Sequence, residues 1–431
     1  MQEDGFFNER IVTFSDDYLK CCKYISTYDT PKRDNFTKMF YSRLTYSSHL
    51  LEDFLDFHGA KNNSSWYFYR ELSAAIRHLS SASYCQKHIL ARLDFYGLPD
   101  TEEFEKNADA VLDFLSGCLI KMSPIIISES IKLNISIPED SFKKEHFQTS
   151  VTSDTLTYDI YDENRDQHKK HIVRIANDFL AISKNFDEIE FFEPYHIEKI
   201  KTIVPEKINE VEIRRYEMLV HNLQSYFDTY VIHGGYMVGN HKLKKFRSYF
   251  SIVFHLLQMM GSLLHFYERH LHEVGYKDIY KKVQSKLSEI IDPDKLLDHT
   301  INFGLYYVCN FLSEGKDLAK IILNENIERG SVTVSVPKSG FHMRPSLLVT
   351  KIVEHYGGQV ELCIGNDRFD ASSLLDMQWA GGKIQKENLS NVLFEGDIRT
   401  LKDLQLLSSI NYCEDIIGKG ISMPKELNYL S

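Results

Sequence analysis

The sequence has little of what marks a secreted or a nucleic-acid-binding protein. Its seven cysteines form no C-x-x-C pair and no disulfide-like framework, which argues against a cysteine zinc site and fits a reducing compartment. The formal net charge is −11 and no basic block is present, so we expect no nucleic-acid partner. The opening stretch "MQEDGFFNERIVTF" carries acidic residues where a secretory signal carries basic ones. These absences predict a cytoplasmic protein.

Long apolar runs and enzyme motifs are also missing. The most apolar stretch, "SIVFHLLQMMGSLLHFY" from Ser251, includes two histidines and a glutamine. It is shorter than the roughly 20 apolar residues that a membrane span needs, so we expect a buried helix and no membrane insertion. No Gly-rich phosphate loop, nucleophile elbow or H-E-x-x-H motif occurs in residues 1–328. That region therefore carries no signature of an enzyme.

Helical periodicity dominates the first three quarters of the chain. Apolar residues recur at spacings of three and four from the start to about Lys121, and again from about Asp166 to Glu328. Between these stretches, "IKLNISIP" and "DTLTYDIYD" alternate polar and apolar residues, which predicts a small β hairpin near 131–160. We expect residues 1–328 to form a mainly α, bundle-like domain of unknown function, with a split near 125–163 as the alternative.

Histidines and acidic residues occur together on the predicted helices, but their spacing does not predict a metal site. Two pairs lie within one predicted helix each: Glu71 with His78, and His265 with Glu268. A di-metal site in a helical bundle would require two copies of Glu-x-x-His, and only "EPYH" from Glu193 has that spacing, with a proline that favours a helix start. We therefore expect no metal, since hydrogen-bonded histidines are commoner than ligands.

Beyond residue 328 the pattern becomes mixed α and β. "SVTVSV" alternates β-branched residues, and nine of the 21 glycines fall after residue 330. The expected order is strand 331–336, helix 343–355, strands 359–364 and 367–370, helix 372–379, strand 391–395 and helix 398–411. This β-α-β-β-α-β-α order predicts an α+β open-faced sandwich, with one sheet covered on one face by helices.

The motif "SGFHMRPSLL" lies at the start of the first helix of this domain. His342 is expected at the N-cap edge, with Pro345 in the first turn, where a missing N–H costs little. The free amides of a helix start attract an anion, and the guanidinium of Arg344 can add a charge-assisted bond to phosphate oxygens. An imidazole that ionises near neutral pH can accept a phosphoryl group and release it again. Taken alone, the motif is better explained by a simple helix cap and a solvated arginine, because short motifs recur by chance.

The surroundings of this motif resemble the histidine-containing phosphocarrier protein (HPr) of the bacterial PEP-dependent sugar phosphotransferase system. "GFHMRPS" is similar to the family motif glycine-leucine-histidine-alanine-arginine-proline-alanine. "FDASSLLDMQWAGG" resembles the segment that carries the family's regulatory serine, with Ser373 at the family's spacing from His342. Gly381 falls where the family has a glycine that closes the short helix. The resemblance covers about residues 329–412, with 413–431 as a C-terminal extension.

The resemblance implies a phosphocarrier rather than a turnover enzyme. His342 would be the phosphoryl acceptor, Arg344 would orient the phosphate, and the backbone amides of Met343 and Arg344 would bind its oxygens. The implied docking surface for partner proteins consists of Phe341, Leu374, Leu375 and Met377. Each of these apolar side chains could equally belong to the inner face of its element.

A regulatory role for Ser373 is also implied by the resemblance. Phosphorylation there would add about two negative charges beside the docking surface. The sequence has Ser372 where the family usually has a basic residue and Asp376 where it usually has glycine, and a serine near a helix start is commonly a cap. Phosphorylation of Ser373 would require an HPr kinase as a further partner.

The implied partners are a PEP-protein phosphotransferase of the enzyme I type as donor, and sugar-permease subunits or regulators as acceptors. No cofactor is implied, because the phosphoryl group comes from PEP through the upstream kinase. Two alternatives remain open at this stage. The protein could be a non-catalytic adaptor that uses the HPr-like fold as a binding module. The helical region could instead be an enzyme or ligand sensor controlled by the appended domain.

Overall fold

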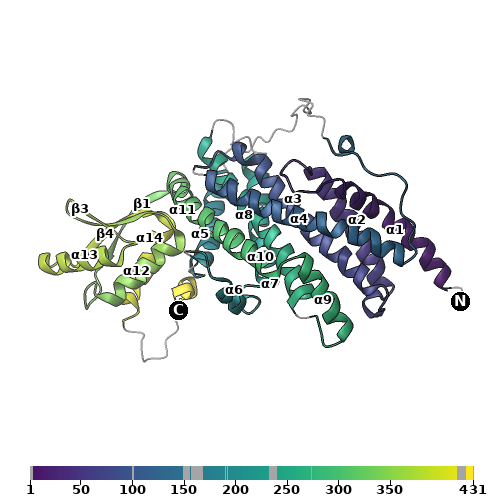
Figure 1. Cartoon of the computed structure of the whole chain (residues 1–431). Coiled ribbons are helices and arrows are strands. Elements are labelled where there is room, and N and C mark those ends of the chain that lie inside the picture. Colours follow the sequence, from purple (N-terminus) through teal and green to yellow (C-terminus); the bar gives the residue numbers. More distant parts are fainter. Residues whose placement is uncertain are drawn as a thin grey trace. The chain divides into compact units, whose positions relative to one another are not determined.

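The computed structural model describes residues 3–99, 101–148, 156, 168–189, 191, 193–232, 240–272, 274–414 and 424–430. These residues form a mainly helical protein with a small C-terminal sheet (Figure 1). They fall into two compact units, each built from three segments of the chain. The helical unit comprises Met1–Ile160, Asn185–Gln224 and Arg247–Ser313, and the sheet unit comprises Tyr161–Lys184, Ser225–Phe246 and Glu314–Ser431.

The helical unit begins with four long helices, α1 (Glu3–Ile25), α2 (Lys38–Phe57), α3 (Tyr67–Tyr96) and α4 (Glu102–Lys132). Each packs on two of the others in a closed ring, α1 on α2, α2 on α3, α3 on α4 and α4 on α1. The purple and blue ribbons of Figure 1 are these four helices. Their apolar stripes form a core rich in aromatic rings, in which the buried Tyr41 hydroxyl bonds to Ser116 at 2.9 Å. The expected bundle-like character of this region is thus present in α1–α4.

The remaining helices follow in chain order and alternate with short helical turns. The α-helices are α5 (His168–Asp187), α6 (Ile197–Ile203), α7 (Glu210–Phe227), α8 (His241–Phe266), α9 (Asp278–Ile290), α10 (Pro293–Asp298) and α11 (Tyr306–Asn326). Three segments have the wider π-helical winding: η4 (Asp228–Ile232), η5 (Tyr267–His272) and η6 (His299–Leu305). Short 3-10 turns are η1 (Ala60–Asn62) and η2 (Lys144–Phe147). Four of the five chain boundaries between the two units fall inside helices, namely α5, α7, α8 and α11.

The hairpin predicted near 131–160 is wrong in its first half. Helix α4 runs through Pro124 to Lys132, and residues 133–148 contain no strand. Asn134, just beyond the C-cap Leu133, has a left-handed φ of 58°, and Ile135 is then buried in the unit. The alternation in "IKLNISIP" therefore reflects a helix end followed by an irregular segment. The second half of the predicted hairpin, 154–162, lies outside the described residues apart from Leu156.

The sheet unit contains a four-stranded antiparallel sheet interleaved with helices, in the predicted order. The strands are β1 (Arg329–Ser335), β2 (Val360–Ile364), β3 (Asp367–Asp370) and β4 (Asn391–Asp397), and the sheet order is β1-β4-β2-β3. Val334 pairs with Val392 and Leu362 with Phe394 in the register, and all four side chains lie in the core. Helices α12 (Met343–Tyr356), α13 (Leu374–Glu387) and α14 (Ile398–Ser409) cover this face (Figure 1).

The C-terminal extension belongs to the sheet unit. After the short turn η7 (Asn411–Cys413), the turn η8 (Lys425–Leu430) packs on α12 and α14. Leu427 and Leu430 are buried in the same core as the sheet residues. The ring of Tyr429 stacks on His355, with 3.8 Å between the ring centroids. The described part of the extension is therefore an integral part of this core.

Two helical stretches of the described residues pass a test of length and apolarity for membrane spans. They are Glu102–Lys132 and His241–His272, with mean hydropathies of 1.8 and 1.3 over their most apolar windows. Half of the first window and 78% of the second are buried inside the protein. Core helices of soluble proteins pass the same test, so this finding is weak evidence for a membrane location.

Candidate phosphohistidine site

The loop between β1 and α12 places His342 at the start of α12. Its turn is closed by a hydrogen bond from the Gly340 amide to the Pro337 carbonyl, 2.8 Å, and Gly340 has a φ of 79°, which favours glycine. His342 is the N-cap of α12, with extended backbone (φ −77°, ψ −174°), and its carbonyl accepts from the Ser346 amide. The N-cap position predicted for His342 is therefore confirmed.

The two ring nitrogens of His342 have different partners. Nδ1 accepts a long hydrogen bond of 3.5 Å from the Arg344 amide, whereas Nε2 lies 2.9 Å from Oε1 of Glu414 and 2.9 Å from Oγ of Ser339. The hydroxyl of Ser339 also donates to Glu414. Both sets of contacts favour the same tautomer, with the proton on Nε2 facing the carboxylate and the lone pair on Nδ1. The lone pair on Nδ1 then faces the start of α12.

Glu414 is held as a carboxylate by these contacts. Burial raises the pKa of this carboxyl group, but the hydrogen bonds from Ser339 and His342 outweigh burial and bring the pKa below its usual value of 4.5. The charge therefore persists at neutral pH beside the imidazole. No signal in the sequence predicts this contact, because Glu414 lies 72 residues from His342 in the extension beyond the family resemblance.

The environment of Nδ1 is suited to binding an oxyanion. The amides of Met343 and Arg344 occupy the first two helical positions, where no carbonyl of the same helix can reach them. Pro345 follows in the first turn and has no N–H. The Arg344 side chain is exposed, and it forms no ion pair with the described residues. Of the predicted phosphate-binding groups, the Arg344 amide therefore lies at Nδ1 of a ring that is 48% exposed.

A pocket of about 540 Å³ adjoins the ring on the side of the β1–α12 loop. His342, Phe341 and Gly340 line it together with Gly381 and Gly382 of α13. A Cβ atom at Gly381 would lie only 2.5 Å from the Phe341 carbonyl oxygen, so the absence of a side chain allows α13 to approach the loop. Gly381 does not close the helix as expected. It lies inside α13, which continues past the predicted end at 379 to Glu387.

The predicted docking residues divide into buried and exposed members. Phe341 and Met377 are 4% and 0% exposed and belong to the core of the sheet unit, so they offer no side chain to a partner. Leu374 is half-buried, and Leu375 is 55% exposed. The sequence analysis missed three exposed apolar side chains on α12 and α13: Met343, Leu347 and Trp379. The spacing of four between Leu375 and Trp379 is a signal that could have identified Trp379.

Ser373 is the N-cap of α13. Its backbone is extended, and its Oγ accepts a hydrogen bond of 3.2 Å from the Asp376 amide. The side chain is half-buried, and the carboxylate of Asp376 turns back to accept from the Asp370 amide. In the structure Ser373 therefore caps α13, and its regulatory role stays a prediction.

Beyond this geometry, the chain was compared with known proteins. No protein-family model, no curated protein and no solved structure matches it.

Proposed function

We propose that this protein is an HPr-type phosphocarrier in which Nδ1 of His342 accepts a phosphoryl group and passes it on. The observation that carries the proposal is the pair of opposed contacts on the ring, Glu414 at Nε2 and the Arg344 amide at Nδ1. Together they present an unprotonated nitrogen to the start of α12. A helix cap alone would need only one of the two contacts.

The chemical step is a transfer between two histidines. As the lone pair of Nδ1 forms a bond to phosphorus, the N–P bond of the donor's phosphohistidine breaks and the donor imidazole leaves with that electron pair. The ring of His342 gains positive charge, which the Glu414 carboxylate offsets through Nε2–H. The phosphoryl oxygens meet the amides of Met343 and Arg344 and the Arg344 guanidinium. Positioning and electrostatic stabilisation supply most of the catalysis in such transfers.

The donor in this proposal is an enzyme I-type PEP-protein phosphotransferase, and the acceptors are sugar-permease subunits or regulators. Exposed apolar side chains on the two helices of the site support docking of such partners. They are Met343 and Leu347 of α12 with Leu375 and Trp379 of α13, and the Gln378 side-chain amide bonds to the Met343 sulfur at 3.4 Å across the two helices. Aromatic and Met side chains of this kind are enriched at protein interfaces.

The test is phosphorylation of the full chain with PEP and the cognate phosphotransferase. We expect one acid-labile phosphoryl group per chain, absent in His342→Ala and retained in the control His355→Ala, an exposed histidine on the same helix. Phosphoramidate, a small phosphoryl donor, tests the ring independently of the donor protein. If neither donor labels the folded protein, the proposal is wrong, and a binding module without phosphoryl transfer becomes the better interpretation.

A further inference from the structure

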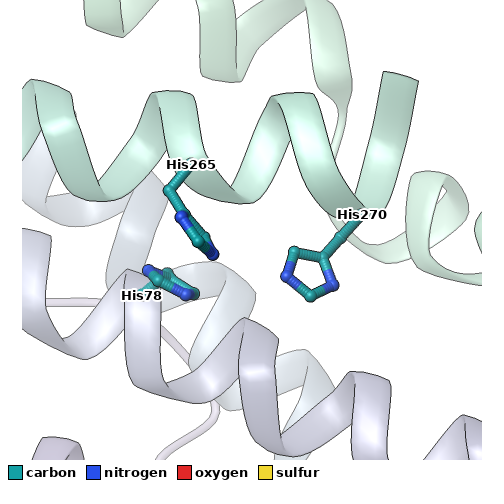
Figure 2. A group of neighbouring side chains, drawn as sticks. All are labelled: His78, His265 and His270. Carbon is teal, nitrogen blue, oxygen red and sulfur yellow. The ribbon is translucent and has the colours of Figure 1, made fainter. Parts of the chain in front are cut away.

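A second constellation lies in the helical unit, among residues that the phosphocarrier proposal does not use. His78 of α3, His265 of α8 and His270 of η5 each offer one ring nitrogen, and these three nitrogens lie within 4.8 Å of one another. Figure 2 shows the three side chains pointing toward one another from the two facing helical segments. His78 and His270 are buried and His265 is half-buried. Such convergence of imidazoles is typical of a transition-metal site.

Two of the rings are oriented by carboxylates from other helices. Nδ1 of His270 lies 2.7 Å from Glu71 of α3, and Nδ1 of His265 lies 2.9 Å from Glu210 of α7. With Nδ1–H donated to a carboxylate, the remaining lone pair of each ring is on Nε2. Metal-binding histidines in proteins commonly have this carboxylate partner on the second nitrogen.

The third ring has an unsatisfied nitrogen. Nε2 of His78 is buried and has no hydrogen-bond partner among the described residues. A neutral imidazole with a free lone pair is the form that binds a metal.

A local change in helical winding brings two of the ligands onto one face. Residues five apart in an α-helix point about 140° away from each other, at about 100° per residue. Between His265 and His270 the α-helix gives way to the π-helical segment η5, whose wider turn brings residues i and i+5 together. Such π-helical insertions are frequent at functional sites.

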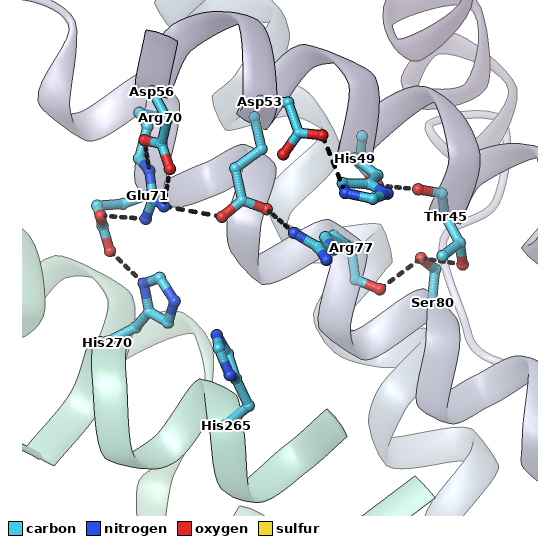
Figure 3. A network of polar contacts seen from close by, with 12 residues as sticks. Thr45, His49, Asp53, Asp56, Arg70, Glu71, Arg77, Ser80, His265 and His270 are labelled. Carbon is cyan, nitrogen blue, oxygen red and sulfur yellow. Dashed lines mark hydrogen bonds and ion pairs between the residues drawn. The ribbon is translucent and has the colours of Figure 1, made fainter. Parts of the chain in front are cut away.

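We propose that His78, His265 and His270 bind one divalent transition-metal ion of the Zn²⁺ class, with Glu71 and Glu210 fixing two of the rings. Figure 3 shows that Glu71 is itself held by the buried Arg70, at 2.9 Å, which also bonds to Asp56. The carboxylate that orients His270 is therefore part of an extended buried network.

In this proposal the fourth ligand of the ion occupies a pocket that borders two of the three imidazoles. This pocket of about 550 Å³ is lined by His265, His270 and Glu71 together with Arg269, Tyr67 and Tyr280. Three protein ligands with a position open to water or substrate are the arrangement of catalytic rather than structural zinc sites. The proposal therefore includes exchangeable water or an anion as the fourth ligand.

Metal binding requires a small contraction of the cluster. His78 and His265 stack with 4.3 Å between centroids at an interplanar angle of 23°, so their ring planes are nearly parallel. Ligands of a tetrahedral Zn²⁺ ion are about 3.3 Å apart, given Zn–N distances of about 2.0–2.1 Å. A tilt of the His78 ring out of the stack would bring its Nε2 toward the other two.

The experiment uses the full chain, stripped with a chelator and then dialysed against Zn²⁺ or Co²⁺. We expect one equivalent of tightly bound metal, and a Co²⁺ spectrum typical of a four-coordinate site with imidazole ligands. We expect His265→Ala to lose both the tightly bound metal and the four-coordinate Co²⁺ spectrum. His255→Ala is the matched control, because His255 is also on α8, also half-buried and also packed on another histidine, His88, at 4.0 Å.

A second variant separates ligation from folding. Glu210→Gln keeps all three imidazoles, and we expect it to weaken Zn²⁺ binding by about 10- to 100-fold, as loss of a carboxylate partner does at other metal sites. Circular dichroism checks that each variant is folded. The proposal is overturned if the folded wild-type chain retains neither Zn²⁺ nor Co²⁺, or if His265→Ala binds as much metal as His255→Ala.

Discussion

The Glu414 carboxylate lies 2.9 Å from Nε2 of His342, although the two residues are 72 positions apart in the sequence. This contact supplies a charged partner for the ring from the C-terminal extension. We expect Glu414→Gln to slow phosphorylation of His342 by about tenfold or more, because a charge-assisted hydrogen bond contributes about 1.5–3 kcal/mol and a neutral amide supports the charged ring less well. Initial rates with PEP and the donor enzyme measure this. Ser339→Ala, which leaves the carboxylate in place, should slow phosphorylation less. Equal phosphorylation rates for Glu414→Gln and wild type would contradict the role of Glu414 as the charged partner of the ring.

The same contact predicts a pH dependence. The pKa of Glu414 lies below its usual value of 4.5, because hydrogen bonds from Ser339 and His342 outweigh burial. A carboxyl with a depressed pKa stabilises the folded state at pH values above its unfolded pKa, and this contribution is lost as the pH falls through the folded value. The His342–Glu414 contact should therefore persist from pH 7 to about 4.5 and break only at lower pH. NMR signals of the His342 ring, compared between wild type and Glu414→Gln, report this directly.

Substitution of two adjacent glycines of α13 by alanine should change the free energy of unfolding in opposite directions. A Cβ at Gly381 would lie 2.5 Å from the backbone oxygen of Phe341, whereas a Cβ at Gly382 meets no atom within 4 Å. We expect Gly381→Ala to destabilise the protein by about 1–3 kcal/mol through overpacking. Gly382→Ala should stabilise it by about 0.5–1 kcal/mol, since alanine is the better helix former. Denaturant unfolding of the two variants side by side tests this, and destabilisation by both would rule out the packing argument.

Trp379 should contribute to partner binding rather than to stability. Its side chain is 62% exposed on α13. We expect Trp379→Ala to change the free energy of unfolding by less than about 0.5 kcal/mol. It should raise the KM for the donor protein about tenfold, as truncation of an aromatic interface residue does. Ile321→Ala, an exposed apolar residue on α11, serves as the control, and phosphoramidate labelling should be equal in both variants.

The capping role of Ser373 predicts a stability effect. Its Oγ accepts from the Asp376 amide at the start of α13. We expect Ser373→Ala to lower the free energy of unfolding by about 1 kcal/mol, whereas Ser373→Asp, which can also cap, should cost less. Ser372→Ala is the control, because the exposed Ser372 bonds only to the side chain of Asp370 and caps no helix. If Ser372→Ala lowered the free energy of unfolding as much as Ser373→Ala, the assignment of Ser373 as the cap would be wrong.

The order of elements in the sheet unit could be predicted because its signals are local. Alternating β-branched residues mark β1, and the apolar spacing after His342 marks α12. The end of α13 was missed for an equally local reason. Two consecutive glycines normally suggest a helix end, but Gly381 is required by the close approach of the Phe341 carbonyl and the helix continues.

The parts of both candidate sites that were missed depend on non-local contacts. From spacing along single predicted helices, Glu71 was grouped with His78, and His265 with Glu268. In the structure Glu71 bonds to His270 and His265 to Glu210, each across two helical segments. A search at helical spacing cannot find such partners, and it also assumes 3.6 residues per turn, which the π-helical segment η5 does not follow. Glu414 was missed because only tertiary packing brings it to the ring.

The division of each unit into three chain segments has a consequence for biosynthesis. The sheet unit needs segments 161–184 and 225–246 as well as 314–431, so a nascent chain cannot complete it until the last of these has left the ribosome. Helices α1–α4 lie within the first 132 residues and can assemble much earlier. Leu180, which lies near Gly357 of the sheet unit, would lack this contact during the interval. Cellular holdase chaperones that bind exposed apolar helices are therefore expected to engage this protein during translation.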